Sequence, residues 1–208
     1  MLLIGMLCIF LCVLRLRTRF YMSSLQCCIF TVLGTIVGVA GAMILYFVES
    51  GFWGGISFFG SVYLIPLIMP LVGKFLGLKW GNTTDLCAPC VAIMIGCMRV
   101  NCFLSGCCGG RETCIGNFTF VWPTQVIDSI SDFIILGWLL RLEFLGKTKE
   151  KLYPLFMLAY SIMRFGLEFL RDTPKDWLGL SHGQCFAIIS VVVSLMWFFC
   201  ISRKRQCL

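Results

Sequence analysis

The sequence predicts an all-α, polytopic membrane protein with about seven transmembrane helices. Hydrophobic residues make up 59% of the 208 residues and charged residues only 13%, whereas soluble domains carry about 25% charged residues. Apolar runs of a length that suits membrane helices divide the chain, and the basic residues gather on one side of the expected membrane. No linker separates these runs, so we expect residues 1–208 to form a single transmembrane domain.

Seven apolar runs lie along the chain, and most approach the roughly 20 residues that cross a bilayer as a helix. They cover residues 1–14, 25–48, 55–72, 86–106, 124–142, 152–170 and 183–201. The first run is short, because 14 residues extend only about 21 Å as a helix. Arg15, Arg17 and Arg19 follow this run, whereas a secretory signal carries its charge in front, so we do not expect a cleaved signal.

The distribution of basic residues predicts an outer N-terminus and a cytoplasmic C-terminus. With this orientation, twelve of the seventeen lysines and arginines lie on the cytoplasmic side and three on the outer side, as the positive-inside rule requires. The remaining two, Arg99 and Arg164, fall inside predicted spans. Because membrane orientation accounts for most of the net charge of +7, we expect no nucleic-acid partner.

Ionisable residues inside the spans indicate a candidate functional site, because a charge at the centre of a membrane helix costs at least about 2.5–3.5 kcal/mol. We expect six ionisable residues, in or directly beside the spans, to lie at one depth below the outer interface: Arg99, Asp128, Asp132, Arg164, Glu168 and Arg171. Two or three arginines at that depth suit the phosphate of a lipid headgroup, since a guanidinium group binds phosphate oxygens bidentately. The alternative is a structural network, in which Arg164 pairs with Glu168 and Arg99 pairs with Asp128 or extends outward.

Five motifs, in order within about residues 50–200, resemble the prolipoprotein diacylglyceryl transferase family. They are GGISFFGS at 54–61, MRVNCFLSGCCGGR at 98–111, PTQVID at 123–128, YSIMRFGLEFLR at 160–171 and LSHGQ at 180–184. The second motif lies without a gap over the family pattern G-R-I-G-N-F-x-N-G-E-x-x-G-R. Each motif is weak alone, but five in order on a chain with seven predicted spans are fairly specific.

The resemblance implies a multi-pass enzyme of the bacterial inner membrane that needs no cofactor. It would move a diacylglyceryl group from phosphatidylglycerol to the lipobox cysteine of a prolipoprotein and release glycerol 1-phosphate. The resemblance implies that Arg99 and Arg164 are catalytic, holding the lipid phosphate and stabilising charge on the leaving group, and that Glu168 is a third catalytic residue that orients Arg164. The residues implied at the phospholipid-binding site are Arg99, Arg164, Arg171, Gln125 and Gly60.

Departures from the family pattern concentrate on the acceptor side and indicate a divergent, cysteine-rich branch. Phe59 stands where the family has a histidine, and Cys102 and Cys107 replace an asparagine and a glutamate. Phenylalanine cannot act as a base, and His182, the only histidine, is an alternative base at the outer start of the last span. Two further hypotheses therefore stay open: the same fold with another acceptor, or a non-catalytic lipid-binding or thiol-redox membrane protein.

The chain contains fourteen cysteines, and most lie in or beside apolar spans, where a free thiol packs as a small hydrophobic group. Cys102, Cys107, Cys108 and Cys114 flank the outer loop instead, and in an oxidising compartment Cys107 or Cys108 could bridge Cys114. The C-x-x-C at 87–90 lies about fifteen residues of helix away, so it cannot share a metal with these four. We predict free thiols and no metal ligands, with a disulfide and a metal site as open alternatives.

Overall fold

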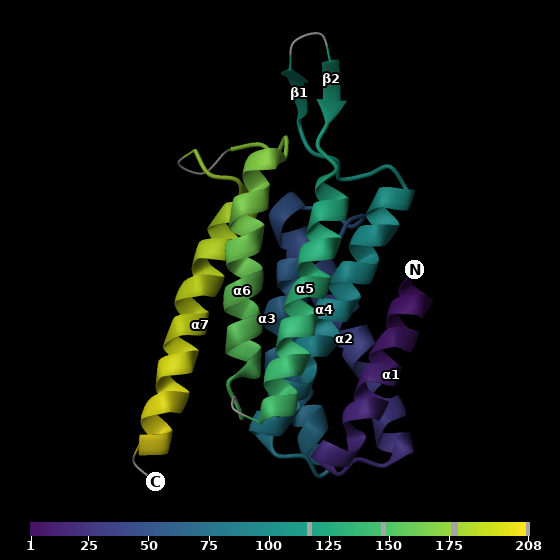
Figure 1. Cartoon of the computed structure of the whole chain (residues 1–208), viewed down its shortest axis with the longest axis vertical. Helices are drawn as coiled ribbons and strands as arrows, with labels where there is room; N and C mark the ends of the chain where they lie inside the picture. The colour runs from purple at the N-terminus through teal and green to yellow at the C-terminus, as the bar shows by residue number, and fades with distance from the viewer. Residues whose placement is uncertain (116–117, 147–148, 176–178, 207–208) are drawn as a thin grey trace.

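The computed structural model describes residues 1–115, 118–146, 149–175 and 179–206, and most of them are helical (Figure 1). The helices are α1 (Leu2–Phe20), α2 (Ser24–Ser50), α3 (Phe58–Phe75), α4 (Trp80–Leu104), α5 (Thr124–Leu145), α6 (Leu152–Leu167), the 3₁₀ turn η1 (Glu168–Leu170) and α7 (His182–Gln206). Strands β1 (Glu112–Ile115) and β2 (Phe118–Val121) form an antiparallel hairpin between α4 and α5. The helical class is thus confirmed, and the hairpin is an addition that the sequence analysis lacks.

Four helices in the described part of the chain are long and apolar enough to cross a membrane. They are α2, α3, α4 and the segment His182–Arg203 of α7. Large apolar side chains remain exposed on the outer faces of the bundle, for example Leu3 at 79% and Val48 at 71%, as expected where lipid is the solvent. The number of seven spans and the orientation in the membrane stay predictions.

The helix ends differ from the predicted spans where polar residues continue a helix. Helix α1 runs through Arg15, Arg17 and Arg19 to Phe20, because arginine is a good helix former although it lowers local hydropathy. Helix α4 begins at Trp80 rather than residue 86. Figure 1 shows the hairpin projecting at one end of the bundle and α7 ending at the other, with α1 beginning part-way along it.

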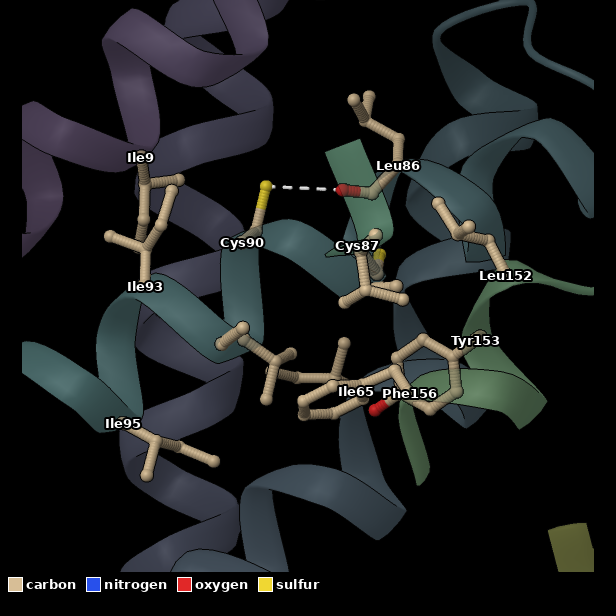
Figure 2. Close-up of a cluster of buried hydrophobic side chains, with 14 of the residues drawn as sticks. Ile9, Ile65, Leu86, Cys87, Cys90, Ile93, Ile95, Leu152, Tyr153 and Phe156 are labelled. Atoms are coloured by element: carbon tan, nitrogen blue, oxygen red, sulfur yellow. Dashed lines mark hydrogen bonds between the residues drawn. The ribbon is translucent and has the colours of Figure 1, made fainter. Parts of the chain in front are cut away.

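A buried apolar cluster joins α1, α3, α4 and α6 (Figure 2). Tyr153 and Phe156 of α6 are fully buried there, beside Cys87 and Cys90 of α4. Both of these thiols are free, and the Cys90 thiol donates a hydrogen bond to the carbonyl oxygen of Leu86 at 3.1 Å. The C-x-x-C motif is therefore part of the apolar core.

Helices α2 and α3 approach each other closely at Gly41 and Gly60. A Cβ atom on either glycine would collide with the backbone of the other, so neither position has room for a side chain. The close contact explains why residue 60 is a glycine. The resemblance implies that Gly60 belongs to the phospholipid-binding site, whereas the structure places it between two helices.

The Gly60→Ala substitution is expected to lower the melting temperature in detergent by several degrees, because overpacking a tight contact costs about 1–3 kcal/mol. Gly137→Ala in α5 is the matched control, since a Cβ atom at that position would meet no neighbouring heavy atom within 4 Å. Alanine also favours a helix over glycine, so this control is expected to be neutral or slightly stabilising. Equal melting temperatures for the two variants would contradict the steric argument.

Candidate functional site

Three arginines from separate segments converge on the buried carboxylate of Asp128 in α5. Asp128 Oδ2 lies 3.1 Å from Nε of Arg99 in α4 and 3.0 Å from Nη1 of Arg164 in α6. Nη1 of Arg171, just after η1, lies 3.9 Å from the same oxygen. One carboxylate thus anchors three guanidinium groups that come from different parts of the chain.

Glu168 binds the other side of the Arg164 guanidinium group. Its Oε2 lies 3.0 Å from Arg164 Nη2, one helical turn away, and its Oε1 accepts a hydrogen bond from the Thr173 hydroxyl at 3.0 Å. Gly183 at the start of α7 packs against the same carboxylate, and a Cβ there would lie 3.0 Å from the carboxyl carbon. Glu168 is therefore held on three sides and fixes the plane of Arg164.

The hairpin positions Arg171, which directly follows the 3₁₀ turn η1 at the end of α6. Helix α6 ends at Leu167 and Arg171 is extended, forming an antiparallel bridge with Gly110. The backbone N–H of Arg111 donates to the carbonyl oxygen of Leu170 at 2.9 Å. These contacts tie the base of the hairpin to the end of α6, and the Arg171 guanidinium group still turns toward Asp128.

Arg99 and Arg171 keep hydrogen-bond donors that no side chain in the described residues uses. Arg99 has one ion pair, through Nε, and its guanidinium carbon lies 4.6 Å from the centre of the Phe58 ring, a cation–π contact. Among the side chains that the structure describes, the Arg171 guanidinium group pairs only with Asp128, at 3.9 Å. Burial lowers the pKa of the Arg171 guanidinium group, and the positive charges of Arg164 and Arg99 lower it further. An anion bound here would relieve that repulsion.

These groups line a cavity of about 530 Å³, which is the size of a small-molecule site. Its walls include all three arginines and Glu168, together with Phe59, Tyr160, Cys102, Cys108 and His182. Phe59 packs edge-on against Tyr160, with ring centres 5.5 Å apart, so the position is apolar. The arrangement can bind an anionic group between the arginines.

Not every residue implied by the resemblance lies at this cavity. Arg99, Arg164, Glu168 and Arg171 line it, whereas Gly60 lies in the contact between α2 and α3. The amide of Gln125 donates a hydrogen bond to the carbonyl oxygen of Cys107 at 2.6 Å, so it holds the loop before the hairpin. The sequence analysis placed Asp128 at the depth of the arginines and named it as a possible partner of Arg99, but nothing local indicates that three arginines share it.

Three outer cysteines lie together beside the arginines. The sulfur atoms of Cys102, Cys107 and Cys108 are all within 4.8 Å of one another, and the cysteines that the structure describes are all free, including Cys114. A hydrogen bond with the Cys102 thiol lowers the pKa of Cys108, against the effect of burial, and the positive charge of Arg171 lowers it further. The spacing C-x-x-x-x-C-C across a helix end was the sequence signal for this cluster.

Comparisons with known proteins agree with the five motifs. The prolipoprotein diacylglyceryl transferase family matches residues 1–200. The chain is 29% identical over 204 residues to the phosphatidylglycerol–prolipoprotein diacylglyceryl transferase 2 of Clostridium perfringens, covering 84% of this chain and 78% of that relative.

Two further relatives carry the name phosphatidylglycerol–prolipoprotein diacylglyceryl transferase. The protein of Clostridium tetani is 30% identical over 135 residues, covering 59% of this chain and 54% of the relative. The protein of Pasteurella multocida is 28% identical over 178 residues, covering 74% and 64%. Because the family match extends over nearly the whole sequence, this chain belongs to the prolipoprotein diacylglyceryl transferase family.

Proposed function

We propose that this protein transfers the diacylglyceryl group of phosphatidylglycerol to the lipobox cysteine thiol of a prolipoprotein. The observation that carries the proposal is the convergence of Arg99, Arg164 and Arg171 on Asp128 at the wall of a 530 Å³ cavity. Family membership and the names of the relatives support the same substrates. The protein acts as a multi-pass component of the bacterial inner membrane.

The arginines bind the phosphate diester and stabilise the charge that appears when it leaves. The acceptor thiol loses its proton to solvent, and its sulfur attacks the glyceryl carbon that carries the phosphate. A carbon–sulfur bond forms while the carbon–oxygen bond breaks, and the bonding electrons move to the phosphate oxygen. The released glycerol phosphate becomes a monoester, so its charge increases. Preorganised donors aimed at developing charge are the largest contribution to catalysis in many enzymes.

The three arginines have different tasks in this proposal. Arg164 is fixed from two sides, by Asp128 and by Glu168, so its remaining edge is preorganised. Arg99 and Arg171 supply donors that have no hydrogen-bond partner among residues 1–115, 118–146, 149–175 and 179–206. Glu168 acts through Arg164 as a positioning residue, because its carboxylate is occupied by Arg164 and Thr173.

The proposal is tested in a bacterial strain depleted of its own diacylglyceryl transferase, by following the mass of a reporter lipoprotein. The wild-type chain is expected to restore lipidation, and Arg99→Gln and Arg164→Gln are expected to abolish it. Arg141→Gln is the matched control, because Arg141 is exposed on α5 and away from the cavity. Rescue by all four chains would exclude the role of the arginines in binding phosphate.

A second candidate function keeps the phospholipid donor and changes the acceptor. It is favoured by Phe59, which lines the cavity at the position where the family motif has a histidine. Phosphatidylglycerol consumption with an unmodified reporter, lost in Arg164→Gln, would support this candidate. Wild-type membranes that neither lipidate the reporter nor consume the phospholipid would contradict both candidates.

A further inference from the structure

We propose that Cys102, Cys107 and Cys108 form a zinc site whose open fourth position binds the acceptor thiol as a thiolate. The inference rests on the proposed transfer to a thiol and names the group that activates that thiol. It also departs from our sequence-based prediction of free thiols, which considered the four outer cysteines without their positions in space.

The three sulfur atoms already lie close to the geometry of a zinc site. All are within 4.8 Å of one another, and sulfur ligands of tetrahedral zinc lie about 3.8 Å apart, given a bond length of about 2.3 Å. Small side-chain rotations therefore close the site. Thiolate ligands select zinc or other soft metals, and they bind magnesium and calcium poorly.

The local backbone brings the three thiols together. Cys102 lies in the last turn of α4, and Gly106 reverses the chain with a φ of 66°. The N–H of Cys107 then donates to the carbonyl oxygen of Cys102 at 3.0 Å. Cys108 has a φ of 60°, a left-handed conformation that residues other than glycine rarely adopt. In an extended chain, neighbouring side chains point to opposite sides. The left-handed conformation of Cys108 breaks this alternation, and its thiol lies near that of Cys107.

Helix α5 holds this turn in place from below. The Gln125 amide donates to the carbonyl oxygen of Cys107 at 2.6 Å, and the Thr124 hydroxyl donates to that of Cys108 at 3.2 Å. Both donors are buried at the start of the helix. The positions of two adjacent cysteines are thus fixed by side chains that otherwise have no role at the cavity, as expected of a preorganised ligand set.

The site opens onto the cavity that holds the arginines. Cys102 and Cys108 line that cavity together with Arg99 and Arg171. Zinc with three thiolates carries a net charge of about −1, which these two guanidinium groups can balance. Catalytic zinc sites have three protein ligands and an open position, and because two of the three cysteines line the cavity, that position would lie beside the arginines.

An acceptor thiol that takes the open position loses its proton to solvent, because a zinc-bound thiol is deprotonated outright. Its sulfur then forms the bond to the glyceryl carbon as the carbon–oxygen bond to phosphate breaks. Zinc keeps its oxidation state throughout, so no oxidant or reductant is needed. This role suits a cavity in which Phe59 occupies one wall and cannot accept a proton.

The first test measures metal binding by the full-length protein in detergent. Competition with a chromogenic chelator is expected to give one zinc ion per chain, and Co²⁺ is expected to give thiolate-to-metal charge-transfer bands. Cys107→Ser and Cys108→Ser should each abolish tight binding. Cys114→Ser is the matched control, because Cys114 is exposed on the adjacent hairpin and lies outside the cluster. Zinc binding that is absent, or unchanged in Cys107→Ser and Cys108→Ser, would overturn the site.

The second test asks whether the metal binds the acceptor. A short lipobox peptide is expected to shift the Co²⁺ charge-transfer bands, and the same peptide with serine in place of cysteine is not. Chelation should abolish transfer and zinc should restore it, while phosphatidylglycerol still raises the melting temperature of the metal-free protein. Transfer that survives chelation and is lost in His182→Gln would overturn the role of zinc. Loss of the phospholipid effect in the wild type would count against the proposed function instead.

Discussion

Replacing Asp128 by asparagine is expected to reduce lipid transfer by more than about 100-fold and to destabilise the protein by about 3–5 kcal/mol. The carboxylate contacts Arg99, Arg164 and Arg171, and removing one partner of a buried ion pair leaves the other charge uncompensated. With the carboxylate gone, three guanidinium groups would repel one another at the same place. Activity is measured as reporter lipidation and stability as the melting temperature in detergent.

Asp132→Asn is the matched control for this prediction. Asp132 lies one turn further along α5 and is as buried as Asp128, yet neither of its carboxylate oxygens has a hydrogen-bond partner among the residues that the structure describes. The same substitution on the same helix therefore removes no hydrogen bond to an arginine and should have a clearly smaller effect. If both variants lose transfer and stability equally, Asp128 is not the shared anchor of the arginines.

Arg164→Lys is expected to lower kcat by about 100-fold or more, the range found when one preorganised donor to a transition-state oxyanion is removed. Lysine keeps the charge but lacks the planar fork that reaches Asp128 and Glu168 together, at 3.0 Å each. The protein should remain folded, because a positive charge still faces both carboxylates. Kinetics of purified protein with phosphatidylglycerol and a lipobox peptide measure the effect.

In the same assay, Glu168→Gln tests the orientation of the Arg164 guanidinium group separately from its presence at the site. The Arg164 guanidinium group stays, but it loses the charged partner that fixes its plane, so we expect a smaller fall in kcat than for Arg164→Lys. Arg141→Lys, on an exposed position of α5, controls for the substitution itself and should behave as wild type. A rise in KM with unchanged kcat in Arg164→Lys would mean that Arg164 binds the substrate without stabilising the transition state.

The sequence analysis treated a phosphate-binding site and a structural network of ion pairs as alternatives for the three arginines, and the structure has features of both. Arg164 pairs with Glu168 and Arg99 pairs with Asp128, as a structural network requires. Arg99 and Arg171 nevertheless line a cavity and keep donors without a hydrogen-bond partner in the described part of the chain. Ion pairing here orients the guanidinium groups, and it leaves part of each group for an anion.

The sequence by itself determined the helical class, the apolar segments and the residues that carry charge into them. It also placed Arg164 and Glu168 one turn apart, a contact that the helix period dictates. These features depend on neighbours along the chain, so periodicity and composition are sufficient to predict them. The same reading of charges in apolar segments named Arg99 and Arg171, although hydropathy could not indicate that α6 ends at Leu167.

Only the tertiary structure decided which residues meet. The sharing of Asp128 by three arginines, the burial of Gly60 against Gly41 and the cluster of Cys102 with Cys107 and Cys108 all depend on the folded chain. The contacts between helices depend on how each helix is rotated and how far it slides along its neighbours. Those two variables are set by packing over the whole bundle, and no local stretch of sequence contains them.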